Sequence, residues 1–318
     1  MQPDLSAIRT AAARIRPYAH RTPVMTCASL DAQVGAQLFL KCENLQKVGA
    51  FKFRGATNAV FSLSDAEAAR GVVAHSSGNH AQALALAARL RGIPAYIVMP
   101  DNAPAVKKAA VAGYGGQITF CAPNLAAREA TQAAVVAATG ATVVHPYNDV
   151  RVIAGQGTAT LELLEDVPDL DVILAPVGGG GLLSGTAIAA TELSPNIRVI
   201  GVEPAGADDA TRSLAAGSII PSLQPQTIAD GLLTSLGDLT FPIIRDRVEQ
   251  IVTVSEEAIV AAMIFIWERA KLIVEPSAAV PIAALWERRI DLSGLRVGVI
   301  LSGGNVDLGR LPWQKNDA

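Results

Sequence analysis

The feature that most constrains this chain is a repeated alternation of short apolar strands with Ala-rich helical segments, which begins at Gly71. Each strand is followed by a turn and a helix-compatible stretch, and this order is typical of parallel βαβ units. The sequence therefore predicts an α/β fold with parallel sheets. A first series of strands is expected at residues 71–75, 95–100, 117–121 and 142–146, and a second at 171–177, 198–204, 250–255 and 296–302.

The chain length of 318 residues indicates two lobes, because one hydrophobic core stops growing at roughly 250–300 residues. We predict that the first series forms a small lobe, residues 71–147. The second series and an early strand at 37–43 form a larger, discontinuous lobe of residues 1–70 and 148–318. Each lobe has three layers, with helices on both faces of its sheet. Ligands of such sheets bind beyond the carboxyl ends of the strands, so we expect a site in the loops that follow them.

Charge and composition exclude several classes of partner. The net charge of -3 and the pI near 5.8 argue against nucleic acid and anionic membrane surfaces. No segment approaches the roughly 20 apolar residues of a membrane span, and the N-terminal segment lacks the apolar core of a signal peptide. Cys27, Cys42 and Cys121 have no CxxC spacing, which favours buried free thiols in a reducing, cytoplasmic location.

Four consecutive glycines close the predicted strand at 171–177 and open a helix: Gly178, Gly179, Gly180 and Gly181. Glycine permits positive φ and lets backbone N–H groups converge on an anion, and the helix N-terminus adds partial positive charge. The pattern predicts a phosphate-binding turn, although an ordinary flexible loop has the same composition. A nicotinamide dinucleotide is an alternative ligand, because Glu203 ends the next strand near where a ribose-binding acid would lie. Residues 177–185, however, contain neither GxGxxG nor the lysine of a P-loop.

Lys52 lies between Phe51 and Phe53, with glycines on either side. Apolar surroundings lower the pKa of an amine and favour the neutral form that makes a Schiff base. A lysine at the edge of an element that extends its ammonium into water is the alternative. The local sequence leaves both interpretations open.

Two further polar turns follow predicted strands. The segment HSSGNHAQ, residues 75–82, could bind a carboxylate through its amides and exchange a proton through a hydroxyl; a simple helix N-cap is the alternative. In LSGGNVD, residues 301–307, Ser302 could offer its hydroxyl to a heterocycle nitrogen. The four histidines have no HExxH spacing, which argues against a catalytic metal.

Together these segments resemble the serine/threonine dehydratase and serine racemase branch of the fold type II (β-family, tryptophan synthase β-like) enzymes that use pyridoxal 5'-phosphate (PLP). The resemblance runs through nearly the whole chain and implies two lobes with the cofactor in the cleft between them. The matching segments, in the family's order, are RTPV at 21–24, KCENLQKVGAFKFRGA at 41–56, SSGNHAQA at 76–83, AGQGT at 154–158, VGGGGLLSG at 177–185, TIADG at 227–231, VEPSA at 274–278 and LSGGNVD at 301–307.

The resemblance implies roles at matching positions. Lys52 would carry PLP and move the Cα proton, Phe51 and Asn79 would contact the ring, and the four glycines would hold the phosphate. Ser302 would face the pyridine nitrogen, where a hydroxyl instead of a carboxylate leaves that nitrogen largely unprotonated and suits β-elimination. Ser77 would act as acid or base on the opposite face of Cα, which would permit racemisation.

The resemblance also implies contacts with substrate. Ser76, Ser77, Gly78 and His80 would grip the substrate carboxylate, with Arg128 and Tyr114 as supports at the rim of the small lobe.

Ion and nucleotide sites are implied in the same way. Glu203, the carbonyl of Ala207 and Asp209 match the site where the racemase branch binds magnesium or calcium, and oxygen ligands suit these cations. Positions that match an ATP site at the racemase dimer interface are Ser29, Lys47, Gln82 and Lys107. ATP as an activator and a homodimer are therefore further expectations.

We expect PLP-dependent dehydration and deamination of L-serine or L-threonine to a 2-oxo acid and ammonia, with serine racemisation as a second activity. A primary serine racemase or a threo-3-hydroxyaspartate dehydratase is the alternative, because VGAFK at 48–52 replaces the TGSFK of many relatives and Tyr147 stands where some racemases carry Asn. An NAD-dependent oxidoreductase and a non-catalytic ligand-binding protein are more distant alternatives. The C-terminal regulatory domain of biosynthetic threonine dehydratases is not expected.

Overall fold

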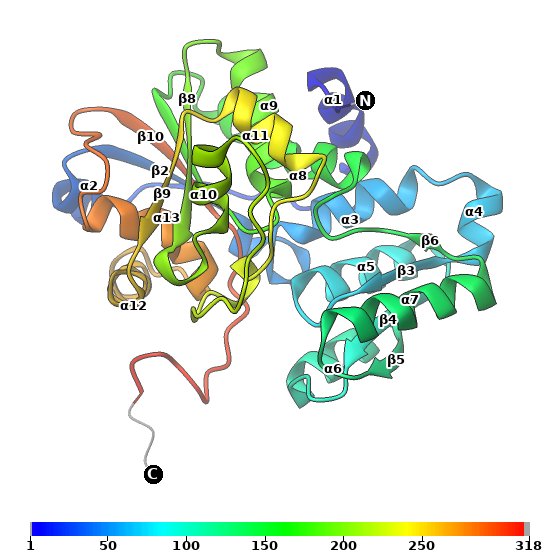
Figure 1. Ribbon diagram of the computed structural model, residues 1–318. Helices are drawn as coiled ribbons and strands as arrows, with labels where there is room; N and C mark the ends of the chain where they lie inside the picture. The colour runs from blue at the N-terminus through cyan, green and yellow to red at the C-terminus, as the bar shows by residue number, and fades with distance from the viewer. Residues whose placement is uncertain (1, 315–318) are drawn as a thin grey trace.

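The computed structural model describes residues 2–314 and contains two separate sheets (Figure 1). The larger sheet has six strands in this described part, in the spatial order β1 (Val24–Met25), β2 (Gln37–Cys42), β10 (Arg296–Leu301), β7 (Val172–Pro176), β8 (Arg198–Pro204) and β9 (Gln250–Val254). The smaller sheet has four, in the order β5 (Gln117–Cys121), β4 (Ala95–Pro100), β3 (Val72–His75) and β6 (Thr142–Val143).

The chain begins in the larger sheet, crosses to the smaller one for β3 to β6, and returns for β7 to β10. All neighbouring strands are parallel except β1 and β2. The α/β class, both strand series and the placement of residues 37–42 in the larger sheet are as the sequence predicts. The exact lobe boundaries at residues 70 and 147 remain a prediction.

Strand β7 shows why the larger sheet needs helices on both faces. Val172 and Leu174 belong to one core cluster, which includes side chains of α12 and α13. Ile173 and Ala175 point the other way, into a cluster with side chains of α8 and α9. Successive side chains of a strand alternate between faces, so a strand buried on both sides is apolar throughout.

The helices complete the layers around both sheets (Figure 1). Their bounds are α1 (Leu5–Ile15), α2 (Ala28–Val34), α3 (Lys52–Phe61), α4 (Asp65–Arg70), α5 (Asn79–Arg91), α6 (Ala105–Gly113), α7 (Leu125–Thr139), α8 (Val150–Asp166), α9 (Gly181–Leu193), α10 (Asp209–Ala216), α11 (Thr240–Arg247), α12 (Glu256–Phe265) and α13 (Pro276–Trp286).

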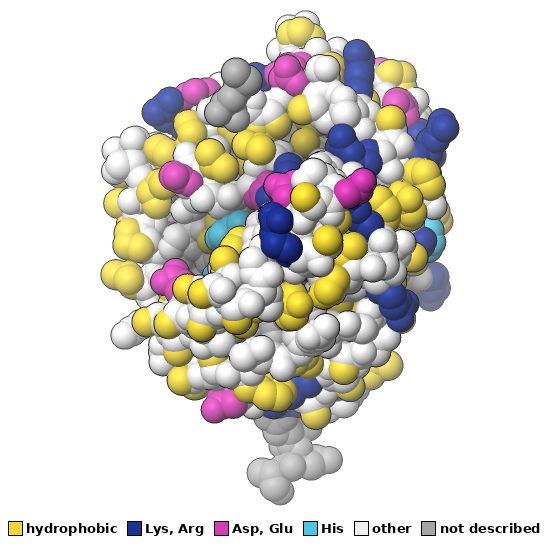
Figure 2. Space-filling model, turned by 90° about the vertical axis from the view of Figure 1, so that its right-hand side faces the viewer, with side chains coloured by type: hydrophobic (Ala, Val, Ile, Leu, Met, Phe, Trp, Pro, Cys, Tyr) yellow, Lys and Arg dark blue, Asp and Glu magenta, His cyan; other side chains and the backbone are white. Residues whose placement is uncertain are grey.

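The smaller lobe is less enclosed than the larger one. Helix α7 has no fully buried residue, and Phe120 on the edge strand β5 is 52% exposed. Figure 2 views this side of the molecule and shows few charged side chains over much of its lower half. The Ala-rich composition of α7 explains its low burial, because short side chains reach only a little way into the neighbouring elements.

Strand β6 is shorter than predicted and β1 was not predicted. The sequence suggests a strand over 142–146, but β6 ends at Val143. Pro146 cannot donate to a sheet ladder, and the carbonyls of Val144 and Pro146 accept hydrogen bonds from side chains instead. Strand β1 has only two residues, too few to show a period.

The three cysteines are buried free thiols, as the sequence predicts. No helix within residues 2–314 has both the length and the apolar character to span a membrane.

Candidate active site

The glycine-rich turn links the carboxyl end of β7 to the first residue of α9. Gly180 has φ 87 and is the N-cap of α9, a conformation that favours glycine. The first amides of a helix have no partner within it and point outward with the positive end of the helix dipole. Gly179, Gly180 and Gly181 are buried. This turn can bind an anion such as phosphate.

Neighbouring segments approach the turn so closely that side chains are excluded from it. A Cβ at Gly179 would overlap the ring of Tyr147, and one at Gly181 would lie 2.9 Å from the Tyr147 Cα. A Cβ at Gly178 would lie 2.9 Å from the Cα of Leu232. Packing and anion binding therefore both require glycine here, and Tyr147 forms one wall of the site.

Lys52 is the first residue of α3 and is partly buried. Its Nζ donates a hydrogen bond of 2.8 Å to the carbonyl oxygen of Pro146, the residue before Tyr147. Burial lowers the pKa of the Lys52 amine to about 8, while the negative charge of Glu275 acts in the opposite direction. A substantial fraction of the amine is then neutral near pH 7.5, and only a neutral amine adds to a carbonyl. Phe51 lies beside it, with Nζ 5.1 Å from the ring centre.

The serine-rich turn faces the same region from the small lobe. It joins the carboxyl end of β3 to the N-terminus of α5, and Ser76, Ser77, Gly78 and Asn79 are all partly buried. A Cβ at Gly78 would meet no atom within 4 Å, so open space lies in front of the helix N-terminus. This N-terminus has room for a carboxylate.

His80 is a neutral side chain in this structure. Burial lowers its pKa to about 3, and the charge of Lys52 lowers it further. Its Nε2 lies 2.9 Å from the Val144 carbonyl oxygen, which assigns the ring proton to Nε2 and leaves Nδ1 as an acceptor. That Nδ1 is buried and has no partner among the described residues. An acceptor repels a carboxylate, so only the backbone of His80 suits the substrate contact predicted from the sequence.

The hydrogen bond of His145 is made by Nδ1, whereas that of His80 is made by Nε2. The His145 Nδ1 accepts the amide of Asn148 at 2.9 Å, so Nε2 carries the proton. Burial lowers the pKa of His145 to about 4, with His75 and Lys52 adding to the effect. The ring lies 4.6 Å from that of Tyr147. His145 thus offers a neutral N–H donor close to Lys52.

Three residues that sequence reasoning missed hold Asn79 and Lys52 in place. The Asn79 Nδ2 donates to both carboxylate oxygens of Glu275, at 2.9 and 3.1 Å. The Asn79 Oδ1 accepts from Asn305 at 2.8 Å. Pro146 contributes through its carbonyl. Burial raises the pKa of Glu275 to about 7. Glu275 in VEPSA could have been found as an acid among apolar residues, whereas Asn305 and Pro146 carry no comparable signal.

Ser302 follows β10 and is buried. Its carbonyl accepts the amide of Phe51 at 3.0 Å, so the loop before Lys52 and the loop after β10 run side by side. The structure therefore joins Lys52, Phe51 and Ser302 through adjacent backbone.

The two supports predicted at the rim have different positions. Arg128 lies in the first turns of α7, after the carboxyl end of β5, and its charge helps burial to lower the pKa of His75. The Arg128 Nε is buried and has no partner among the described residues. Tyr114 ends α6 just before β5 begins and lies 5.6 Å from Arg89. It is therefore near the amino end of the sheet, away from the site.

The predicted cation ligands form a second polar group, at the end of β8. The Glu203 carboxylate accepts the amides of Ala210 at 3.2 Å and Thr211 at 2.6 Å. Burial raises the pKa of Glu203 to about 7 and that of Asp209 to about 6. The Asp209 Oδ2 is buried without a partner among residues 2–314, and the Ala207 residue lies between the two acids. Two buried carboxyls fit a cation, although no group of three His, Cys, Asp or Glu that could hold a metal occurs in this described range.

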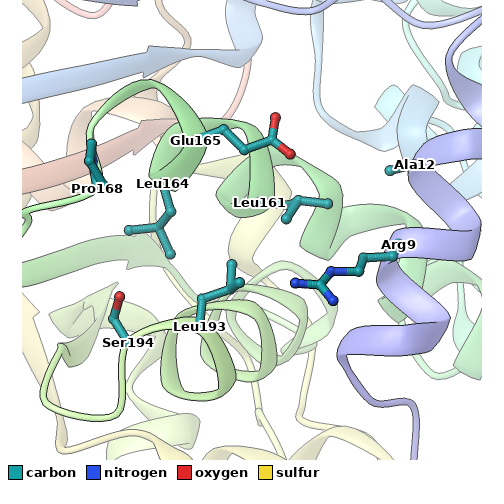
Figure 3. Close-up of a pocket in the computed structure, with 8 residues that line it drawn as sticks. All are labelled: Arg9, Ala12, Leu161, Leu164, Glu165, Pro168, Leu193 and Ser194. Carbon is teal, nitrogen blue, oxygen red and sulfur yellow. The ribbon is translucent and has the colours of Figure 1, made fainter.

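A separate surface groove of about 460 Å³ lies between α1, α8 and α9 (Figure 3). Leu193 and Ser194 end α9 just before β8, so the groove is at the amino ends of the strands, opposite the site. Glu165 at its rim is already paired with Arg21 at 2.7 Å. Its lining residues are Arg9, Ala12, Leu161, Leu164, Glu165, Pro168, Leu193 and Ser194.

Two parallel-sheet lobes, a lysine amine of lowered pKa and a glycine-rich helix start define the fold type II class of enzymes, which bind a phosphorylated aldehyde through a lysine. The site fits PLP, because the amine, the anion-binding turn and the buried Ser302 are held in one region. The family model for "Pyridoxal-phosphate dependent enzyme" matches residues 15–303, and the chain belongs to this family.

Similar proteins support the same assignment. The chain is 55% identical to a beta-hydroxyaspartate dehydratase of Paracoccus denitrificans, over 94% of this chain and 95% of that protein. It is 51% identical to maize serine racemase, whose structure superposes with a TM-score of 0.96 and coverages of 97% and 95%. A threonine deaminase of known structure, from T.th., is 46% identical, with a TM-score of 0.92 and coverages of 96% and 99%.

Proposed function

We propose that this enzyme dehydrates and deaminates L-β-hydroxy-amino acids, with L-serine and L-threonine as the leading substrates, to a 2-oxo acid and ammonia. The observation that carries the proposal is the Lys52 amine, whose pKa is lowered to about 8 and which lies beside the glycine-rich turn. Relatives named threonine deaminase and beta-hydroxyaspartate dehydratase support this reaction class.

Bound PLP would supply a carbonyl for the substrate amine and a ring that withdraws electrons from Cα. The amides at the start of α9 would hold its phosphate. Once released, the Lys52 amine would take the Cα proton, and the Pro146 carbonyl would orient its Nζ. The amides of the serine-rich turn would hold the substrate carboxylate, while Phe51, Asn79 and Ser302 would contact the ring. A hydroxyl at Ser302 would keep the pyridine nitrogen largely unprotonated.

Serine racemisation is a second activity in this proposal. It requires a second acid or base on the face of Cα opposite Lys52, and Ser77 is the candidate because it follows β3 at the partly buried turn. The likeness to maize serine racemase favours the activity.

A second candidate substrate is threo-3-hydroxyaspartate, which carries one more carboxylate than serine. The supporting observation is Arg128, whose Nε is buried without a partner among the described residues. A second carboxylate would provide a charge-assisted partner for that guanidinium. The beta-hydroxyaspartate dehydratase relative is consistent with this choice.

We further propose a magnesium or calcium ion at Glu203, Ala207 and Asp209, and a cytoplasmic homodimer. ATP as an activator is also proposed, at the four positions named above. Of its four positions, Lys107 is paired with Asp230 at 2.6 Å and Lys47 lies 5.8 Å from the Phe53 ring. Gln82 lies in the first turn of α5 and Ser29 is exposed in α2.

The test is a substrate panel on purified enzyme, in which 2-oxo acid, ammonia and product chirality are followed with and without magnesium and ATP. The protein should be yellow, and borohydride should fix the cofactor to a peptide that contains Lys52. A colourless protein that gains no absorbance with PLP would refute the proposal. A yellow protein that releases no 2-oxo acid from any hydroxy-amino acid would favour a ligand-binding role.

A further inference from the structure

Val48, four residues before Lys52, has a backbone conformation that its side chain disfavours. Its φ is 57 and its ψ is 15, in the left-handed region. A β-branched residue is a genuine outlier there, because its Cβ substituents crowd the backbone. The other described non-glycine residues with positive φ are unbranched and exposed: Gln224, Lys271 and Arg288. Val48 is 7% exposed.

The backbone around Val48 is fixed by the loop that follows β10. The Asn305 Nδ2 donates to the Val48 carbonyl oxygen at 2.7 Å. The Gly304 amide donates to the Gly49 carbonyl at 2.9 Å, and Ala50 forms an antiparallel bridge with Gly303. The segment before Lys52 is thus paired, residue by residue, with the segment after Ser302.

The Val48 side chain packs where the two lobes meet, and its turn, Lys47–Gly49, contacts α5 of the smaller lobe. It belongs to a core cluster with Phe53 and Ala56 of α3 and with Val72 and Ala74 of the smaller sheet. The carbonyl of Val48 is therefore bound by the loop after β10, while its side chain packs in a cluster that α3 shares with the smaller sheet. Strained backbone persists only where surrounding contacts over-determine it, and it concentrates at functional sites.

We propose that Val48 is a positioning residue, which connects the two lobes and uses its strained, stiff backbone to fix the direction of the Lys52 amine. The proposal rests on the function proposed above for Lys52. Asn305 takes part in the same positioning, because its Nδ2 donates to both the Val48 carbonyl and the Asn79 Oδ1. A flexible residue at position 48 would let α3 and its first residue shift, and displacements of this kind lower kcat more than they raise KM.

The test compares Val48→Gly with Val48→Ala, because both remove the same apolar contacts and differ mainly in the backbone. Because left-handed backbone strains alanine but not glycine, the glycine variant should unfold about 3 °C above the alanine variant, the reverse of the usual order. If that strain positions Lys52, the more stable glycine variant should have a kcat about 10-fold below that of the alanine variant. KM should change little, and Val48→Ile, which remains β-branched, should keep kcat near the wild-type value.

Arg288→Gly and Arg288→Ala form the matched control, because Arg288 has φ 53 at an exposed position. The same stability order is expected there, with kcat unchanged. A glycine variant at position 48 that is less stable than the alanine variant, or as active as it, would overturn the proposal. Asn305→Ala should lower kcat as Val48→Gly does, and the double variant should be little worse than either; additive effects would separate the two residues.

Failure of the proposed function gives a different result. If the wild-type enzyme turns over no hydroxy-amino acid, two measurements still test the role of Val48. These are the order of stability of Val48→Gly and Val48→Ala, and the dissociation constant for PLP. A PLP affinity that is weakened by Val48→Gly and unchanged by Val48→Ile would support it, and equal affinities would refute it.

Discussion

The glycine-rich turn of the larger sheet and the serine-rich turn of the smaller sheet have the same place in their units but are built differently. A Cβ at Gly179 would overlap Tyr147, whereas a Cβ at Gly78 would meet nothing within 4 Å. The strand before the first turn is buried on both faces, while helix α7 of the small lobe has no fully buried residue. The molecule therefore combines a tightly packed turn, suited to a cofactor, with a roomier turn, suited to a substrate that enters and leaves.

The largest expected effect concerns Lys52, which lies between the glycine-rich turn and the serine-rich turn. Lys52→Ala should reduce 2-oxo acid formation from L-serine by more than about 1000-fold, because no other amine replaces it as nucleophile and base. The exposed Lys271→Ala variant should match the wild type. Steady-state release of pyruvate measures both. A Lys52→Ala enzyme within about tenfold of the wild-type rate would remove Lys52 from the mechanism.

The serine-rich turn should separate two activities. Ser77→Ala should lower D-serine formation from L-serine by about 100-fold, the typical contribution of a positioned acid or base. Pyruvate release should remain within about threefold, because the proposed mechanism places Lys52 on the other face. Chiral chromatography and a pyruvate assay on the same samples make the comparison, with Ser76→Ala as the neighbouring control. Equal loss of both products would show that the two faces do not have separate bases.

How much of this could be predicted from the sequence depends on the range of each interaction. Strands β5 and β8 match their predicted bounds, because apolar runs and turns are local signals. Local motifs also identify Lys52 and Ser302 as candidates. Glu275 and Asn305 were missed because they act on Asn79 across 196 and 226 residues of chain. The neutral state of His80 depends on burial and on the charge of Lys52 in another element, which no spacing rule encodes.

Replacing one glycine of each turn with alanine tests directly whether the two turns differ in packing. Gly179→Ala should lower the free energy of unfolding by about 2 kcal/mol and weaken PLP binding, because the added methyl group overlaps Tyr147. Gly78→Ala should change stability by less than about 0.5 kcal/mol and act mainly by raising KM. Urea unfolding and PLP titration measure the difference. Similar destabilisation at both glycines would mean that the two turns are equally tightly packed.

The smallest effects are expected in the pH dependence of stability, where the two regions have opposite signs. Burial raises the pKa of Glu203 in the larger lobe from 4.5 to about 7, so the folded state binds a proton that the unfolded chain releases. This contribution stabilises at low pH and is lost as the pH rises from about 5 to about 7. Burial lowers the pKa of His80 in the smaller lobe from 6.5 to about 3, so its contribution is present above pH 6.5 and is lost as the pH falls.

Two glutamine variants should separate these opposing contributions to the free energy of unfolding, each of which changes by about 2 kcal/mol between about pH 5 and about pH 7. In metal-free protein, Glu203→Gln should remove the loss of stability between about pH 5 and about pH 7 and expose the loss on acidification that His80 causes. His80→Gln, which can still donate to the Val144 carbonyl, should do the reverse. Magnesium or calcium should stabilise the wild type at about pH 7.5 but not Glu203→Gln, because the cation needs an ionised carboxylate. Urea unfolding across this pH range checks both signs, and parallel curves for the two variants would contradict the assignment of opposite pH dependences to Glu203 and His80.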